Sequence, residues 1–155
     1  MQLYTRRMDN HTAKYPEIVK AVEAMDYPPK TVVIAEFTID PRLKLPHMEA
    51  FKRISDIDRV DTLEGKLNED QSEALRRQET YPVHAAVFGM LYYNGKPVWE
   101  THTYEEMRAT YVAPLPSDDD GFPLFRTVLL NLNNLDEVYH FLKITGDMHE
   151  GALAF

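Results

Sequence analysis

The chain of 155 residues contains no cysteine. Disulfide bonds, thiolate metal sites and cysteine nucleophiles are therefore excluded. Long apolar runs are also missing, since no stretch approaches the ~20 apolar residues of a membrane-spanning helix. The segment from Met1 to Met8 has no apolar core of the kind that a secretory signal needs. We therefore expect a cytoplasmic protein that has no membrane partner.

Positive charge is scarce, because 17 Lys and Arg residues face 25 Asp and Glu residues, for a net charge of -8. Affinity for nucleic acid comes mostly from Lys and Arg that neutralise phosphates. The negative net charge argues against a protein that binds phosphates over its whole surface, but it is compatible with a local basic patch or a basic partner domain. The 6 histidines have no metal-site spacing, and no His-Glu-x-x-His motif occurs.

What is present is enough for one folded domain, since 44% of the residues are hydrophobic and 11% are aromatic. Alternating and β-branched runs predict strands over residues 2–7, 31–39, 82–93 and 97–101, and near 124–132 and 151–155. Helical spacing predicts helices over residues 16–25, 103–111 and 135–145, with further helical segments over 47–54 and 68–79. Strands and helices without regular βαβ alternation indicate an α+β fold with antiparallel sheets and packed helices.

Local signals support these boundaries. Pro16 suits the first turn of a helix, where its missing N–H costs nothing. Thr103 and Glu106 stand at capping-box spacing at the start of the next predicted helix. Asn94-Gly95 is typical of a tight hairpin turn after the long apolar strand.

Four residues are candidates for function, each with an ordinary alternative. Glu36 lies in the middle of an apolar strand, where it either faces solvent from an edge or presents a carboxylate to a sugar hydroxyl or a metal ion. Phe88 is either a core residue or a stacking surface for a ligand. Arg6 either contacts phosphate or points to water, and Glu150 before Gly151 can be an ordinary turn residue.

The order of these segments resembles the nucleotidyltransferase domain of ATP-dependent DNA ligases. In that family, the stretch after the nucleotidyl lysine reads approximately "lfSRn…T.kyPei", and later motifs read Asp-Gly-Glu, "vFDlLyldGk", "eRr" and "EG.v.K". The similar segments cover nearly the whole chain in the same order; they are Leu3–Arg6, Thr12–Ile18, Val33–Glu36, Val87–Lys96, Glu105–Arg108 and Glu150–Gly151. The resemblance implies an incomplete nucleotidyltransferase (ATP-grasp-like) domain over residues 1–155.

The resemblance also implies roles for the four candidates. Arg6 would lie near the nucleotide or DNA phosphates, Glu36 would bind the ribose of the adenylate, and Phe88 would stack on adenine. Glu150 would place a metal ion or the ribose, and Glu36 is the other implied metal ligand. Family members use ATP and Mg²⁺, form a lysyl adenylate and seal nicked DNA in repair and replication. We predict that Glu36, Phe88 and Glu150 line one concave surface with Arg6 at its rim.

The chain also departs from the family pattern. No Lys-x-Asp-Gly motif occurs, so no catalytic nucleophile can be assigned; the lysines stand at positions 14, 20, 30, 44, 52, 66, 96 and 143. Ile34-Ala35 replaces Asp-Gly before Glu36, Gly89 replaces the Asp after Phe88, and Phe155 stands where the family has a lysine. We therefore expect a piece of a larger ligase or a degenerate relative, without the OB domain and inactive alone.

Three hypotheses remain open at this point. The chain is a ligase fragment that is enzymatic only when completed; or it is a non-catalytic module that binds nucleotide, nucleic acid or protein; or it is a generic α+β interaction domain. A missing segment would leave a strand edge or apolar patch uncovered, so we also expect self-association.

Overall fold

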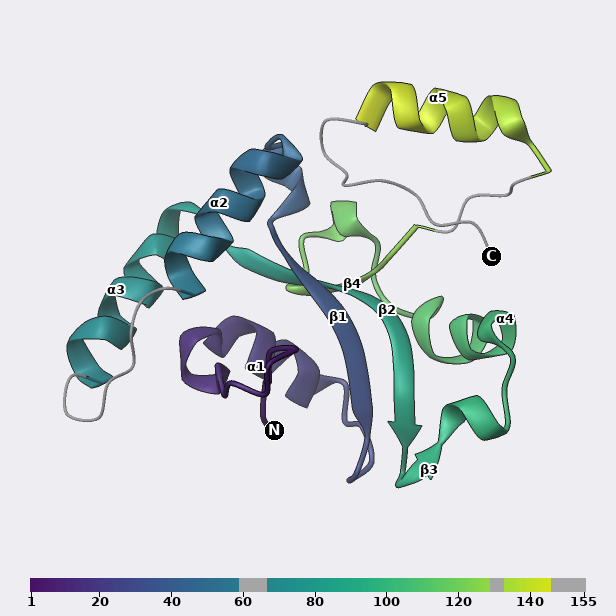
Figure 1. Ribbon diagram of the computed structural model, residues 1–155, viewed down its shortest axis with the longest axis horizontal. Coiled ribbons are helices and arrows are strands. Elements are labelled where there is room, and N and C mark those ends of the chain that lie inside the picture. Colours follow the sequence, from purple (N-terminus) through teal and green to yellow (C-terminus); the bar gives the residue numbers. More distant parts are fainter. Residues whose placement is uncertain (59–66, 129–132, 146–155) are drawn as a thin grey trace.

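The computed structural model describes residues 1–58, 67–128 and 133–145. Its centre is one mixed sheet in which β2 (Val83–Tyr93) is the longest strand (Figure 1). β1 (Val32–Ile39) runs antiparallel along one side of β2. On the other side, β3 (Lys96–Pro97) pairs with the end of β2 and β4 (Leu124–Arg126) pairs with its beginning. The predicted α+β class is confirmed.

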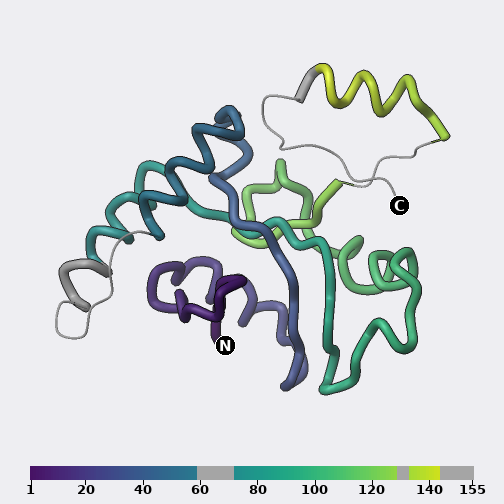
Figure 2. Tube along the Cα trace, viewed as in Figure 1, coloured from purple at the N-terminus to yellow at the C-terminus, as the bar shows by residue number. Residues whose placement is uncertain are grey.

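The helices that precede β4 lie around this sheet, as the trace in Figure 2 also shows. α1 (Pro16–Ala24) covers one face of the sheet, and α2 (His47–Asp58) and α3 (Leu67–Thr80) lie together beside the sheet. α4 (Tyr104–Met107) follows β3, and α5 (Leu135–Thr145) comes last. None of the described helices is both long and apolar enough to cross a membrane.

The core lies between α1 and the sheet. Tyr15 and Ile18 are almost completely buried at the start of α1, and the Tyr15 ring meets Phe37 of β1 edge-on at 4.8 Å. The remaining buried apolar residues come from both strands, from α2 and α3, and from the segment after α4; they include Ile39, Ile57, Ala74, Val83, Ala85, Val87, Met90, Val112 and Leu115. The alternate residues of β1 and β2 that face α1 therefore build the core.

Several local predictions are confirmed. The Thr103–Glu106 capping box forms, with both reciprocal hydrogen bonds present. Asn94 and Gly95 both have positive φ, at 52° and 77°, as the tight turn between β2 and β3 requires. The segments predicted as helices over 16–25, 47–54, 68–79 and 135–145 are α1, α2, α3 and α5, with α2 longer than expected.

Residues 2–7 do not form a strand of the sheet, so that prediction is wrong. The segment turns back on itself because the Thr5 N–H donates to the Asp9 carbonyl at 3.0 Å and Met8 takes a positive φ of 67°. A single bridge joins Tyr4 to Asn10. Alternation of side chains predicted the strand, but a strand also needs a pairing partner along its length.

The segments after β2 also differ from the prediction. β3 is only two residues long, and Val98–Glu100 turns into a 3₁₀ helix after Pro97, which has no N–H for the ladder. β4 is parallel to β2, because the chain passes through α4 and two further turns before it returns to the sheet. The antiparallel prediction is therefore wrong for this pair, and β4 ends at Arg126. Residues 129–132 and the strand predicted at 151–155 lie outside the described residues.

The helix predicted over 103–111 is only partly α-helical. α4 ends at Met107 and continues as one π-helical turn, Arg108–Val112, which the Ala113 N–H closes on the Arg108 carbonyl at 2.8 Å. The next residue, Pro114, has no N–H with which to continue an α-helical ladder. This wider turn holds the buried side chain of Arg108 against the sheet.

Candidate nucleotide site

Glu36 and Phe88 lie close together on the β1–β2 ladder. Glu36 pairs with Ala86, two residues before Phe88. The register shifts next to this pair, because Ala35 faces Val87 while Ile34 faces Gly89. Phe88 has no partner in β1 and forms a β-bulge, a feature that re-aims a side chain. Both Glu36 and Phe88 are exposed, and Phe88 keeps 37% of its surface accessible.

The position of Gly89 has apolar surroundings. A Cβ at Gly89 would lie 3.6 Å from the Ile34 Cδ1 and 3.8 Å from the Met107 Cε. Ile34 is also the β1 residue opposite Gly89 in the register. The structure therefore places the two positions together, and no carboxylate stands at either of them.

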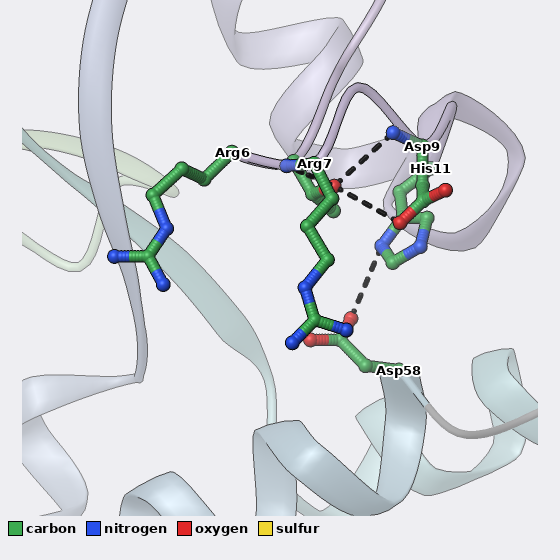
Figure 3. Close-up of a pocket in the computed structure, with 6 residues that line it drawn as sticks. Arg6, Arg7, Asp9, His11 and Asp58 are labelled. Atoms are coloured by element: carbon green, nitrogen blue, oxygen red, sulfur yellow. Dashed lines mark hydrogen bonds and ion pairs between the residues drawn. The ribbon is translucent and has the colours of Figure 1, made fainter.

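Arg6 lies in a different opening of about 340 Å³, shown in Figure 3. Thr5, Arg7, Asp9, His11 and Asp58 complete its lining. Arg6 and Arg7 come from the tight turn that replaced the predicted strand, and their side chains extend in different directions, with the Arg7 guanidinium on the side of Asp58 (Figure 3). Asp58 comes from the end of α2, so the opening joins segments far apart in the sequence.

The Asp58 side chain is fixed by several contacts. Its Oδ1 lies 3.2 Å from the His11 Nδ1 and accepts a hydrogen bond from the Tyr15 hydroxyl. Burial, followed by the contact with Asp58, raises the pKa of Tyr15. The buried Lys14 donates from Nζ to the Asp58 main-chain carbonyl at 2.7 Å. The Asp58 side chain and main chain are therefore held by residues 11–15.

Residues 1–154 match the family described as the ATP dependent DNA ligase domain. The chain belongs to that family. A search of curated proteins found no match. The family match agrees with the order of motifs in the sequence and with the α+β architecture, and it covers nearly the whole chain.

Of the four residues that the ligase resemblance implies, the structure describes three, and they lie in two places. Glu36 and Phe88 are neighbours on the sheet. Arg6 lies in the opening beside α1, which neither Glu36 nor Phe88 lines. Glu150 lies outside the described residues, so the predicted surface shared by Glu36, Phe88 and Glu150 stays a prediction.

The ligase family uses ATP and a divalent metal ion. Among the residues that the structure describes, no group of three or more His, Asp or Glu side chains is arranged to hold a metal ion. Of the two metal ligands that the ligase resemblance implies, Glu36 is the one among the described residues, and the neighbouring Ile34 and Gly89 carry no carboxylate. These residues do not fit a protein-held Mg²⁺ site; Mg²⁺ is often held mainly by substrate phosphates together with one or two carboxylates.

Two lysines of the chain, Lys14 and Lys30, differ in exposure, since Lys14 is buried and Lys30 is exposed. Lys14 is 4% exposed, and its ammonium is engaged by Asp58. Lys30 has a positive φ of 60° and packs beside Gly95 at the hairpin turn. Neither has the sequence context of a nucleotidyl lysine. Sequence reasoning missed two features here, the His11–Asp58 contact and the buried Arg108, because both depend on partners distant in the chain.

Proposed function

We propose that this chain is the central part of a ligase adenylation domain and binds the nucleoside part of ATP reversibly. Phe88 stacks on the adenine ring and Glu36 accepts hydrogen bonds from the ribose hydroxyls. The observation that carries the proposal is the pairing of an exposed aromatic ring with an exposed carboxylate at one bulge of the sheet. Aromatic stacking contributes about 1–3 kcal/mol per base, so binding by this pair is weak.

Arg6 and Arg7 are two adjacent basic residues at an opening that Asp9 and Asp58 also line. In the proposal, they meet phosphates of the nucleotide or of nicked DNA, and Glu150 completes the ribose or metal contacts. Mg²⁺ arrives with the phosphates of the nucleotide, which it neutralises. Nick sealing in repair or replication, in the cytoplasm, requires a segment with the nucleophilic lysine and an OB domain.

The experiment is a titration of the protein with ATP, followed by NMR, for the wild type, Phe88→Ala and Phe122→Ala. Phe122 is a matched control because it is an exposed phenylalanine, 57% accessible, on the acidic turn. Loss of stacking is expected to weaken binding roughly 5- to 150-fold in Phe88→Ala. Equal affinities for the two variants would overturn the assignment of Phe88.

The covalent step is tested separately, since adenylation needs a lysine placed in line with the α-phosphate. Intact-mass measurement after incubation with ATP and Mg²⁺ is expected to detect no adenylyl adduct, and nicked DNA is expected to stay open. A stable adduct would mean that another lysine has become the nucleophile.

The second candidate function is a non-catalytic module that uses the same fold for binding. The apolar surroundings of Gly89 favour it, because Ile34 and Met107 line the position at which the family pattern has an acid. The test adds the segment with the nucleophilic lysine in trans. A non-catalytic module is expected to bind nucleotide but to form no adenylate, whereas a ligase fragment is expected to become adenylated.

Self-association is part of the proposal. β1 pairs with β2 on one side, and no described strand pairs with its other edge. Open edges of this kind promote pairing between chains. A molar mass from light scattering that rises with protein concentration supports this expectation, and a constant monomer mass contradicts it.

A further inference from the structure

The guanidinium of Arg108 is buried against the strand that carries Phe88. Arg108 is 7% exposed and lies on the π turn after α4. Its Nη1 donates to the Thr127 Oγ1 at 2.8 Å and its Nη2 donates to the Thr127 carbonyl at 2.8 Å. Among the described ion pairs none involves Arg108, and its Cζ lies 6.0 Å from the centre of the Tyr104 ring. Burying a cation without a carboxylate is costly, so an apolar side chain would fill this space more cheaply.

Thr127 links Arg108 to β2 by hydrogen bonds. Its N–H donates to the Val87 carbonyl at 3.0 Å, and its hydroxyl donates to the same oxygen at 3.1 Å. The Thr127 hydroxyl thus donates to Val87 while it accepts from Arg108. The Val87 carbonyl belongs to the same planar peptide group as the Phe88 N–H. Fixing this oxygen therefore fixes the orientation of the peptide that leads into Phe88.

The contact lies where the strand pairing on both sides of β2 is interrupted. On the β1 side, Phe88 is the bulged residue without a partner. On the other side, pairing with β4 ends at Val87, and pairing with β3 begins at Tyr92. The described ladders leave the Phe88 position without a strand partner on either side, and Thr127 is hydrogen-bonded to the backbone next to this gap.

We infer that Arg108, acting through Thr127, is the positioning residue that holds the Phe88 bulge in the orientation that presents its ring. The inference rests on the proposed function for its consequence, since a misplaced ring stacks poorly on adenine. The contact from Arg108 through Thr127 to the Val87 carbonyl, called the clamp below, is a property of the fold and can be measured without nucleotide.

The test compares Arg108→Met with Arg126→Met. Arg126 is the matched control, since it lies on β4 next to the clamp but its guanidinium donates to the Leu115 carbonyl instead of Thr127. Cross-strand NOEs between Ile34 and Gly89 report the bulged register. They are expected to weaken or shift in Arg108→Met and to stay unchanged in Arg126→Met.

ATP titrations of the same variants supply the second readout. Arg108→Met is expected to raise the Kd by at least roughly 5-fold, the lower end of a stacking loss. In a Phe88→Ala background, the same substitution is expected to add nothing. Arg108→Lys, which keeps the charge but not the two-pronged contact, is expected to restore part of the affinity.

Three results would decide against or for the inference. Unchanged Ile34–Gly89 NOEs in Arg108→Met overturn it, whatever happens to the thermal stability. Altered NOEs in a protein whose wild type binds no ATP support the clamp and overturn the proposed function instead. If Arg108→Met does not fold, Thr127→Val and Thr127→Ser take its place, because serine keeps the hydroxyl and valine does not. Loss of the Ile34–Gly89 NOEs in the valine variant alone supports the inference. Equal NOEs in the two variants overturn it.

Discussion

The hydrogen bond from Tyr15 to Asp58 connects the core to the arginine-lined opening. Tyr15 is fully buried, and its ring is held edge-on by Phe37. Its hydroxyl donates to Asp58, the acid that also contacts His11. Tyr15→Phe removes this hydroxyl and leaves the ring and its packing in place. The substitution therefore isolates one hydrogen bond without opening a cavity of any size.

The expected loss follows from the nature of the acceptor. A hydrogen bond to a charged group contributes about 1.5–3 kcal/mol to stability. Asp58 keeps His11 as a second partner, and 39% of its side chain is exposed, so water replaces the lost donor in part. We therefore expect a loss of about 1.5 kcal/mol, at the lower end, which corresponds to a fall in Tm of roughly 3–6 °C for a domain of this size.

The assay is urea unfolding of the wild type, Tyr15→Phe and Tyr4→Phe. Tyr4 is 50% exposed and its hydroxyl donates to nearby Gln2, so its loss is expected to change stability by less than about 0.5 kcal/mol. A Tyr15→Phe variant as stable as Tyr4→Phe would refute the reasoning, because the buried hydroxyl would then contribute nothing beyond an exposed one.

The pH dependence gives an independent check. Burial, and then Asp58, raise the pKa of Tyr15 above its ordinary value of 10.0, so folding favours the neutral hydroxyl. The stabilisation is complete below that ordinary value and is lost as the pH rises above it, by about 1.4 kcal/mol per pH unit. The phenylalanine variant lacks this group, so the stability gap is expected to close above pH 10. A gap that stays constant would contradict the assignment.

Three further substitutions test other parts of the fold. Burial lowers the pKa of His84 below 6.5 despite nearby Asp40, so the neutral side chain stabilises the fold above pH 6.5 and this stabilisation is lost as the pH falls. In His84→Leu, the free energy of unfolding measured in urea is therefore expected to change less between about pH 7 and about pH 5 than in the wild type. Gly121→Ala would put a Cβ 2.3 Å from the Arg42 Nη1 at a φ of 75°, and a loss of roughly 1–2 kcal/mol from backbone strain is expected in thermal melts, with no loss contradicting it. Thr103→Ala removes the helix cap and is expected to cost about 1 kcal/mol in denaturant unfolding, against no change for Thr101→Ala.

Local sequence determined the elements whose signals are complete within a few residues. Pro16 with helical spacing predicted α1, Thr103 with Glu106 predicted the start of α4, and Asn94-Gly95 predicted the tight turn. The order of motifs also identified the ligase family, and the missing Lys-x-Asp-Gly is a fact of sequence alone. Each of these depends on the identity of neighbouring residues and on no distant partner.

Tertiary structure decided the features that depend on pairing between distant segments. Alternation predicted a strand at residues 2–7, but no strand in the described part of the chain pairs with it and the segment forms a turn. Periodicity carried no information on the parallel return of β4, on the bulge at Phe88 or on the contact from Arg108 to Thr127. The physical reason is that side-chain period reports which face of a strand is buried, whereas register and partner depend on the free energy of contacts made only after the chain has folded back.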